Sequence, residues 1–180
     1  MTGPADMRIE KLSPRLVAKP WGRTSLPPIF DATQGDRIGE VWYEGHDQQA
    51  APLLVKYIFT SEKLSIQVHP NDAQAGALGQ PRGKSECWYI LDCEPGAVLG
   101  IGLQEPMTAA SFAASIGDGS IEDRLEWHPI AAGDFFYIPA GTVHAIGAGI
   151  SLVEIQQNSD ITYRLYDYGR ERALHIDAGT

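Results

Sequence analysis

The sequence contains few cysteines and few positive charges. Only Cys87 and Cys93 occur among 180 residues, which is too few for a disulfide framework. Lysine and arginine together number 14, against 23 aspartates and glutamates, so the formal net charge is −9. A nucleic-acid-binding domain usually carries a basic patch. This composition therefore argues against nucleic acid as a partner.

Long apolar runs are also missing. No stretch of roughly 18 apolar residues occurs, so we expect no transmembrane helix and no membrane partner. The first six residues lack the charged and apolar regions of a signal peptide. We therefore expect a cytoplasmic protein whose two thiols stay reduced. Cys87 is expected to be a core or wall residue, since free cysteines are usually buried.

The sequence does contain a series of short β-rich stretches between glycine and proline turns. A hydrophobic fraction of 43% is enough to fill a core, and 180 residues predict one domain. This spacing is typical of an all-β sandwich or barrel. The expected strands are residues 38–43, 53–59, 64–69, 84–91, 97–103, 135–138, 144–146, 150–157 and 162–166.

A few short helices are expected between these strands. Asn71 and Asp72 can cap an alanine-rich helix over residues 73–78. Residues 108–116 have helical spacing, with a threonine at the cap position, and residues 121–127 are interpreted as a further helical turn or two.

The N-terminal part contains a stiff, turn-forming piece at residues 19–22, Lys-Pro-Trp-Gly. The predicted organisation is a single domain over residues 1–180, with an N-terminal arm of about 1–35 and a short helical insert at about 108–127.

The stretch from Gly133 to His144 is the most informative part of the chain. It begins with a Gly-Asp turn, continues as an aromatic and β-branched strand, and stops at Pro139, which cannot donate to a sheet ladder. Gly141 allows the backbone to turn back before His144. This pattern, G-x(5)-P-x-G-x(2)-H, resembles the second motif of the cupin superfamily. The resemblance implies an all-β, cupin-like β-barrel (jelly roll) with a few short helices, and it would point His144 into the barrel mouth.

Polar residues alternate with apolar ones in the stretch 64–69. Side chains two apart on a strand share one face, so Gln67 and His69 are expected to point the same way. Leu64, Ile66 and Val68 are expected on the opposite face. A Gln-x-His pair on one face of a strand can supply two ligands to a metal ion.

Two more residues complete a candidate metal site, Glu86 in the next predicted strand and His144 after the Pro-x-Gly turn. Lys84 and Trp88 are expected to point with Glu86, because they are two residues away on either side. Two imidazoles, a carboxylate and an amide oxygen suit zinc and also tolerate iron, manganese or cobalt. Each residue alone is more often a satisfied polar side chain, and it is the combination that indicates a metal.

Several segments together resemble the type I mannose-6-phosphate isomerase family over about residues 14–172. The similar segments, in order, are KPWG at 19–22, QVHPND at 67–72, GKSECWY at 83–89, GDFFYIPAGTVHAI at 133–146 and VEIQQNSDITYR at 153–164. The resemblance implies that Gln67, His69, Glu86 and His144 bind one zinc ion per chain. It also implies that Lys84, Glu154 and Arg164 lie at the active site.

The family interconverts mannose 6-phosphate and fructose 6-phosphate, so the resemblance implies a sugar-phosphate substrate. Isomerisation through an enediol needs a base, and Glu154, His144 and Lys84 all remain candidates. Arg164 is suited to gripping a phosphate or an oxyanion, and Lys84 supplies a second positive charge. Trp21 is expected either to stack on the sugar or to pack under the barrel.

Longer members of this family carry a helical domain and a second β-domain, for which this chain has no room. Two alternatives to the isomerase therefore stay open. One is a cupin isomerase or epimerase acting on another sugar, and the other is a non-catalytic sugar-binding cupin with a structural metal. A cupin dioxygenase is less expected, because such sites usually offer three histidines and here Gln67 replaces one. A homodimer formed edge to edge is a further expectation.

Overall fold

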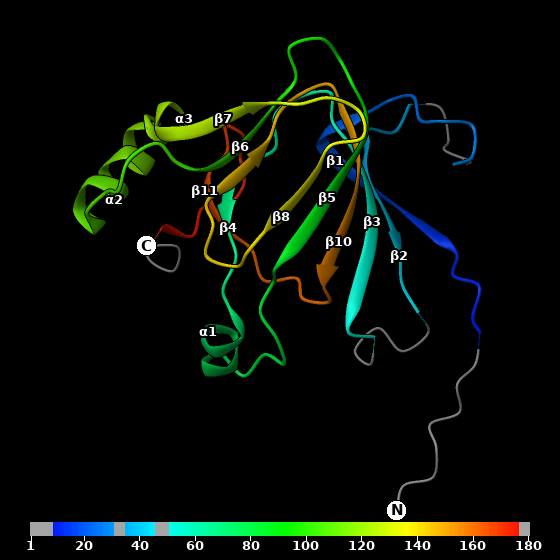
Figure 1. Cartoon of the computed structure of the whole chain (residues 1–180), viewed down its shortest axis with the longest axis horizontal. Helices are drawn as coiled ribbons and strands as arrows, with labels where there is room; N and C mark the ends of the chain where they lie inside the picture. The colour runs from blue at the N-terminus through cyan, green and yellow to red at the C-terminus, as the bar shows by residue number, and fades with distance from the viewer. Residues whose placement is uncertain (1–8, 31–34, 46–50, 177–180) are drawn as a thin grey trace, which may run out of the picture.

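The computed structural model describes residues 9–30, 35–45 and 51–176 (Figure 1). Within these ranges the chain forms two antiparallel sheets and three short helices. The predicted all-β architecture with a few short helices is confirmed. No helix in this part of the chain is long and apolar enough to cross a membrane.

The first sheet has six strands in the order β1-β2-β3-β10-β5-β8. Their bounds are β1 Pro14–Arg23, β2 Ile38–Tyr43, β3 Leu53–Phe59, β10 Ile150–Gln157, β5 Glu86–Cys93 and β8 Phe135–Ile138. The second sheet has five strands in the order β11-β4-β9-β6-β7. These are β11 Tyr163–Tyr166, β4 Ile66–Val68, β9 His144–Ile146, β6 Val98–Leu103 and β7 Leu125–Pro129.

The two sheets face each other across an apolar core. Trp88, Ile90 and Leu152 enter this core from the first sheet, and Leu99 and Ile146 enter it from the second. All five side chains are almost completely buried. Neighbouring side chains on a strand point to opposite faces. Gln67 lies between the outward-facing Ile66 and Val68, so its side chain points inward, at one end of the core.

The three helices are α1 Asp72–Ala77, α2 Ala109–Asp118 and α3 Ile121–Arg124. Helices α2 and α3 pack on the outside of the second sheet, and α1 lies in the connection after β4. The predicted caps are confirmed, since Asn71 caps α1 and the Thr108 side chain accepts from the Ser111 amide. Phe112 and Ile116 of α2 pack in one cluster with Ile66 and Val68 of β4. Figure 1 shows α2 and α3 beside the second sheet, away from β5 and β10.

Two expectations about local structure were wrong. The piece 19–22 is not a separate turn but part of β1, and the pairing with β2 is irregular between Ala18 and Arg23. Proline is tolerated at such a bulge, because it has no amide to donate. The helix expected over 121–127 ends at Arg124, because Leu125 turns to extended backbone and β7 pairs with β6.

The face assignment of Leu64 was also wrong. Ile66 and Val68 point outward against α2, as expected, but Leu64 belongs to the core between the sheets. The reason is that regular strand geometry begins only at Ile66. Cys87 is a partly buried, outward-facing residue of β5, so it lies in the wall, which is one of its two expected positions. The division of the chain into one domain with an N-terminal arm stays a prediction.

Candidate active site

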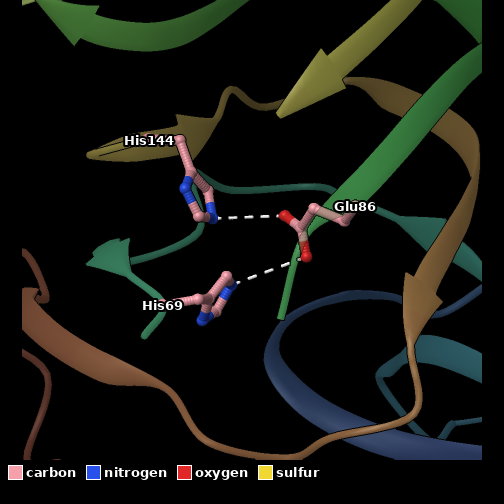
Figure 2. A group of neighbouring side chains, drawn as sticks. All are labelled: His69, Glu86 and His144. Carbon is pink, nitrogen blue, oxygen red and sulfur yellow. Dashed lines mark ion pairs between the residues drawn. The ribbon is translucent and has the colours of Figure 1, made fainter. Parts of the chain in front are cut away.

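Three side chains from three strands converge at one end of the core. His69 follows β4, Glu86 begins β5 and His144 begins β9. Figure 2 shows the two imidazoles and the carboxylate pointing toward one another. One ligand atom from each of the three lies within 4.8 Å of the others. The three residues are 1–2% exposed, so this cluster is sealed from bulk water on most sides.

Both imidazoles are oriented by backbone carbonyls. Nδ1 of His69 donates to the carbonyl oxygen of Ile161 at 3.0 Å, and Nδ1 of His144 donates to that of Thr142 at 2.9 Å. A carbonyl can only accept, so each Nδ1 carries the proton and each Nε2 keeps its lone pair. Such a second hydrogen bond is the usual way in which a metal-ligating histidine is held.

Glu86 lies between the two lone pairs. Its Oε1 is 3.3 Å from Nε2 of His144, and its Oε2 is 3.5 Å from Nε2 of His69 (Figure 2). Among the described residues, neither carboxylate oxygen has a hydrogen-bond partner of acceptable geometry, although Nζ of Lys84 lies 3.1 Å from Oε2. A buried carboxylate without donors is costly. The site is therefore suited to a cation.

Gln67 is the fourth residue of the cluster. It pairs with His144 across β4 and β9, and its amide nitrogen lies 3.2 Å from Nε2 of His144. Rotating the amide group by half a turn would exchange its nitrogen and oxygen, so that the oxygen would face Nε2 of His144. Two imidazole nitrogens, a carboxylate and an amide oxygen form a donor set that fits zinc and other divalent ions of the first transition row.

The protonation states also suit a metal. Burial, followed by the positive charge of Lys84, lowers the pKa of His69 to about 3. Burial likewise lowers the pKa of His144. Burial would raise the pKa of Glu86, but the positive charge of Lys84 is the main opposing effect, and that pKa is held well below its usual value. Near neutral pH the site thus presents two neutral imidazoles and one carboxylate, which are the ligating forms.

A cavity of about 370 Å³ opens beside this cluster. That volume is at the lower end of the range for small-molecule sites, about 300–1,000 Å³. The predicted residues on its wall are Trp21, Gln67, Lys84, Glu154 and Arg164. Its charged lining comprises five lysines and arginines against three carboxylates, in a chain whose net charge is −9. This cavity, which we call the inner cavity, is therefore locally attractive to anions.

A second, larger hollow of about 910 Å³ adjoins the inner cavity. The two share Lys19, Trp42 and Asp160 on their walls. The larger hollow touches none of the four predicted metal ligands. Gln67 lines the inner cavity, so the inner cavity is the candidate substrate site, and the larger hollow adjoins it.

Glu154 lies on the wall of the inner cavity and is held at both oxygens. Nζ of Lys56 is 3.3 Å from Oε1, and the indole nitrogen of Trp88 donates to Oε2 at 3.2 Å. Burial and the negative charge of Glu86 raise the pKa of Glu154, while Lys56 opposes them. A carboxylate with a raised pKa in a cavity is a candidate proton carrier.

Arg164 lies opposite Gln67 in the pairing of β11 with β4, so it is next to the proposed metal site. Its Nη1 donates to the carbonyl oxygen of Ala173 at 2.9 Å. Its Nε is buried and has no hydrogen-bond partner within the described ranges. A buried guanidinium nitrogen left unpaired is suited to an anionic ligand. Trp21 is only 2% exposed and belongs to the core between the sheets. Most of its side-chain surface therefore contacts other core residues, and little is left to contact a sugar.

Sequence reasoning missed Lys56, Glu40 and Trp42, all of which line the inner cavity. Lys56 stands directly opposite Trp42 on one side and Glu154 on the other in the sheet register. Its ammonium lies 4.2 Å from the centre of the Trp42 ring. The available signal was a single lysine inside the apolar strand LLVKYIF, since such a residue is rarely buried without a partner.

Gly83 lets the strand that carries Glu86 approach the loop that follows His69. A Cβ atom at Gly83 would lie 2.4 Å from both the Pro70 oxygen and the Asn71 carbonyl carbon. We expect Gly83→Ala to lose about 2 kcal/mol in the free energy of unfolding, because overpacking against backbone has no easy relief. Urea unfolding measures this loss.

Gly76 provides a matched control for that substitution. It lies in α1, a Cβ there would meet nothing within 4 Å, and Gly76→Ala should be neutral or stabilising by up to about 1 kcal/mol. Equal stability of the two variants would contradict the close approach of β5 to this loop.

The fold and the site define a class, a cupin-like β-barrel with a candidate metal site at one end of its core. No protein-family profile matches the chain. It is 47% identical over 155 residues to mannose-6-phosphate isomerase ManA of Bacillus subtilis, covering 82% of this chain and 45% of that protein. It is 44% identical over 132 residues to mannose-6-phosphate isomerase of Streptococcus mutans, covering 70% of this chain and 42% of that protein.

Solved structures agree. The crystal structure of mannose 6-phosphate isomerase from Bacillus subtilis matches with a TM-score of 0.83 at 32% identity, over 93% of this chain and 66% of that one. A mannose 6-phosphate isomerase bound with zinc and yttrium shares the fold, with a TM-score of 0.65 at 15% identity, over 92% of this chain and 72% of that one. The chain is a homologue of the mannose-6-phosphate isomerases and has their cupin fold. It spans about half the length of the curated relatives it matches.

Proposed function

We propose that the chain is a metal-dependent aldose–ketose isomerase that interconverts mannose 6-phosphate and fructose 6-phosphate through an enediol. The observation that carries this proposal is the position of the buried Glu86 carboxylate between two imidazole lone pairs. Gln67 and Lys84 of the same cluster line a cavity with excess positive charge. Homology to enzymes with this name supports the same reaction. The cytoplasm is the location we propose for it.

One divalent ion per chain, zinc by the donor set, would be held by Gln67, His69, Glu86 and His144. When bound, it supplies a Lewis acid that polarises the C1 and C2 oxygens of the sugar and stabilises the negative charge of the enediolate. A distant fold neighbour is described as bound with zinc and yttrium, which is in line with this choice of metal.

Glu154 is the residue we propose as the proton carrier. Its carboxylate takes the proton from C2 of the aldose and returns it to C1, while the proton of the O2 hydroxyl passes to O1, so that no proton is gained or lost overall. Lys56 and Trp88 fix the direction of this carboxylate, since each contacts one of its oxygens. Lys84 is less suited to act as the base, because its ammonium group is already engaged by Glu86 and lies 2.9 Å from Nε2 of His69.

Arg164 and Lys84 are proposed to bind the anionic parts of the substrate. Arg164 offers a buried Nε without a partner among the described residues, and Lys84 lines the same cavity. A planar guanidinium binds phosphate or an oxyanion with two parallel hydrogen bonds. Trp21 is proposed only as a wall that limits where the sugar ring can lie.

The test is a coupled assay on the zinc-loaded protein with mannose 6-phosphate and with unphosphorylated mannose. We expect turnover of the phosphate ester and at most slight turnover of mannose. Turnover of both sugars at equal rates would overturn the assignment of the cationic cavity to phosphate. Zinc binding without turnover of either sugar would instead favour a sugar-binding cupin with a structural metal.

A further inference from the structure

The cations that line the inner cavity fall into two groups. In the first group each ammonium lies 3.1–3.3 Å from a carboxylate oxygen, and its members are Lys19, Lys56 and Lys84. Their charges are therefore largely compensated within the protein. The second group comes from β11 and the chain that follows it. It contains Arg164 and Arg172, with His175 in contact with Arg164 on the same cavity wall. We call these three residues the β11 wall.

Arg172 is held in a fixed direction by Asp167. Its Nε donates to Oδ2 of Asp167 at 2.6 Å, and its Nη2 donates to Oδ1 at 2.7 Å. Asp167 is only 2% exposed. A two-point contact of this kind fixes the plane of the guanidinium group. The third nitrogen, Nη1, takes no part in this contact, and Arg172 still lines the inner cavity.

Arg164 adds a second guanidinium group to the same wall. Its Nε is buried and has no hydrogen-bond partner within the described ranges. Burial, followed by the positive charge of Arg172, lowers the pKa of Arg164, so the two guanidinium groups are close enough to repel each other. A phosphate ester carries a charge of about −1.5 to −2 near neutral pH. One phosphate group would therefore compensate both arginines.

His175 supplies a neutral donor to this wall. The backbone amide of Arg164 donates to Nδ1 of His175 at 3.2 Å. An amide N–H can only donate, so Nδ1 must accept and the ring proton is on Nε2. The β11 wall therefore offers a ligand one imidazole N–H, whose position on the ring is set by the backbone, in addition to two charged groups.

The β11 wall also lies at a suitable distance from the candidate metal site. Arg164 stands opposite Gln67 of β4, and on its other side its carbonyl oxygen accepts from the His175 amide at 2.7 Å. Neighbouring extended segments lie about 4.8 Å apart, so the backbone of His175 is roughly 10 Å from that of Gln67. A hexose 6-phosphate carries its phosphate at the end opposite to C1 and C2, and it can span such a separation.

We propose that Arg164, Arg172 and His175 together bind the phosphate group of the substrate. Asp167 is then a positioning residue, because it directs Arg172 but does not itself line the inner cavity. This inference rests on the proposed function, since it assigns one part of that substrate to one wall of the cavity. Lys84, which lies 3.1 Å from Glu86, is left for the C1 and C2 end of the sugar.

An NMR titration of the zinc-free full chain with inorganic phosphate tests the proposal without any turnover. We expect Arg172→Met to raise the dissociation constant at least about tenfold, because it removes a charged donor. Arg170→Met is the matched control, since Arg170 donates to Oδ1 of Asp167 at 2.8 Å but does not line the inner cavity. Each variant leaves Asp167 with one arginine, and the control should bind phosphate as the wild type does.

Kinetics of the zinc-loaded protein provide a second measurement. Arg172→Met should raise KM for mannose 6-phosphate at least about tenfold while kcat changes by no more than about threefold, because the phosphate is bound equally in the ground state and the transition state. Arg172→Lys should recover part of the loss in KM, since it restores the charge but not the planar guanidinium group.

The outcomes separate this inference from the proposed reaction. A wild-type chain that binds no inorganic phosphate would overturn the phosphate site, and so would equal weakening by Arg172→Met and Arg170→Met. Normal turnover of mannose 6-phosphate with an unchanged KM in Arg172→Met would overturn the site and leave the isomerase standing. Phosphate binding that depends on Arg172, without turnover of mannose 6-phosphate, would support the site and count against the isomerase.

Discussion

Replacing Glu86 with glutamine should release the metal and reduce turnover of mannose 6-phosphate by roughly a thousandfold or more. The substitution keeps the size of the side chain but removes the charge that faces both imidazole lone pairs. Loss of the Lewis acid raises the activation free energy by several kcal/mol, and each 1.4 kcal/mol lowers the rate about tenfold. Metal content and steady-state rates of the same preparation measure both effects.

Glu126→Gln is the control for that experiment. Glu126 lies on β7, and its side chain is 58% exposed, so removing its charge should alter neither metal content nor rate. A Glu86→Gln protein that binds zinc as tightly as wild type would show that the ion sits elsewhere. Full metal occupancy with normal turnover would show that Glu86 is needed neither to bind the metal nor for the reaction.

Replacing Lys56 with methionine should lower kcat about a hundredfold while KM changes by no more than about threefold. The substitution leaves the methylene stem but removes the charge 3.3 Å from Oε1 of Glu154. Of its two contacts with described residues, the carboxylate then keeps the one with the Trp88 indole, and it is no longer fixed in direction. Lys56→Arg should restore part of kcat, because it returns a positive charge.

The pH profile separates positioning from a purely structural role. Burial and the charge of Glu86 raise the pKa of Glu154, and Lys56 lowers it. Without Lys56 that pKa must rise further, so the acid side of the kcat/KM profile should move to higher pH if Glu154 acts as the base. Lys63→Met, at an exposed ion pair with Glu122, should leave the profile unchanged.

Kinetics of the Lys56 variants could also contradict the positioning role of Lys56. Breaking a buried ion pair costs about 3–5 kcal/mol of stability, so Lys56 variants must first be shown to be folded at the assay temperature. A large rise in KM for mannose 6-phosphate, with kcat unchanged, would show that Lys56 binds substrate directly. It would then not be the residue that orients Glu154.

Much of the fold was predictable because its signals are local. The pattern Gly133 to His144 specifies a strand, a turn and an inward-pointing histidine within a dozen neighbouring residues. Alternation within β4 placed Gln67 and His69 on one face. The convergence of His69, Glu86 and His144 followed from those faces once the sheets had closed.

What could not be predicted depends on which strands pair. Lys56 meets Glu154 only because β3 lies beside β10, nearly a hundred residues further along the chain. Glu40 and Trp42 reach the inner cavity through the pairing of β2 with β3. No local pattern contains that information. The strand at β7 was missed for the same reason, since its backbone is extended only because it pairs with β6.

Titrating the metal-stripped protein with zinc while recording mannose 6-phosphate turnover tests the central claim most directly. We predict that activity starts near zero, rises in proportion to zinc, and stops rising at one equivalent per chain. Activity that is independent of zinc, or that needs several equivalents, would contradict a single catalytic ion held by Gln67, His69, Glu86 and His144.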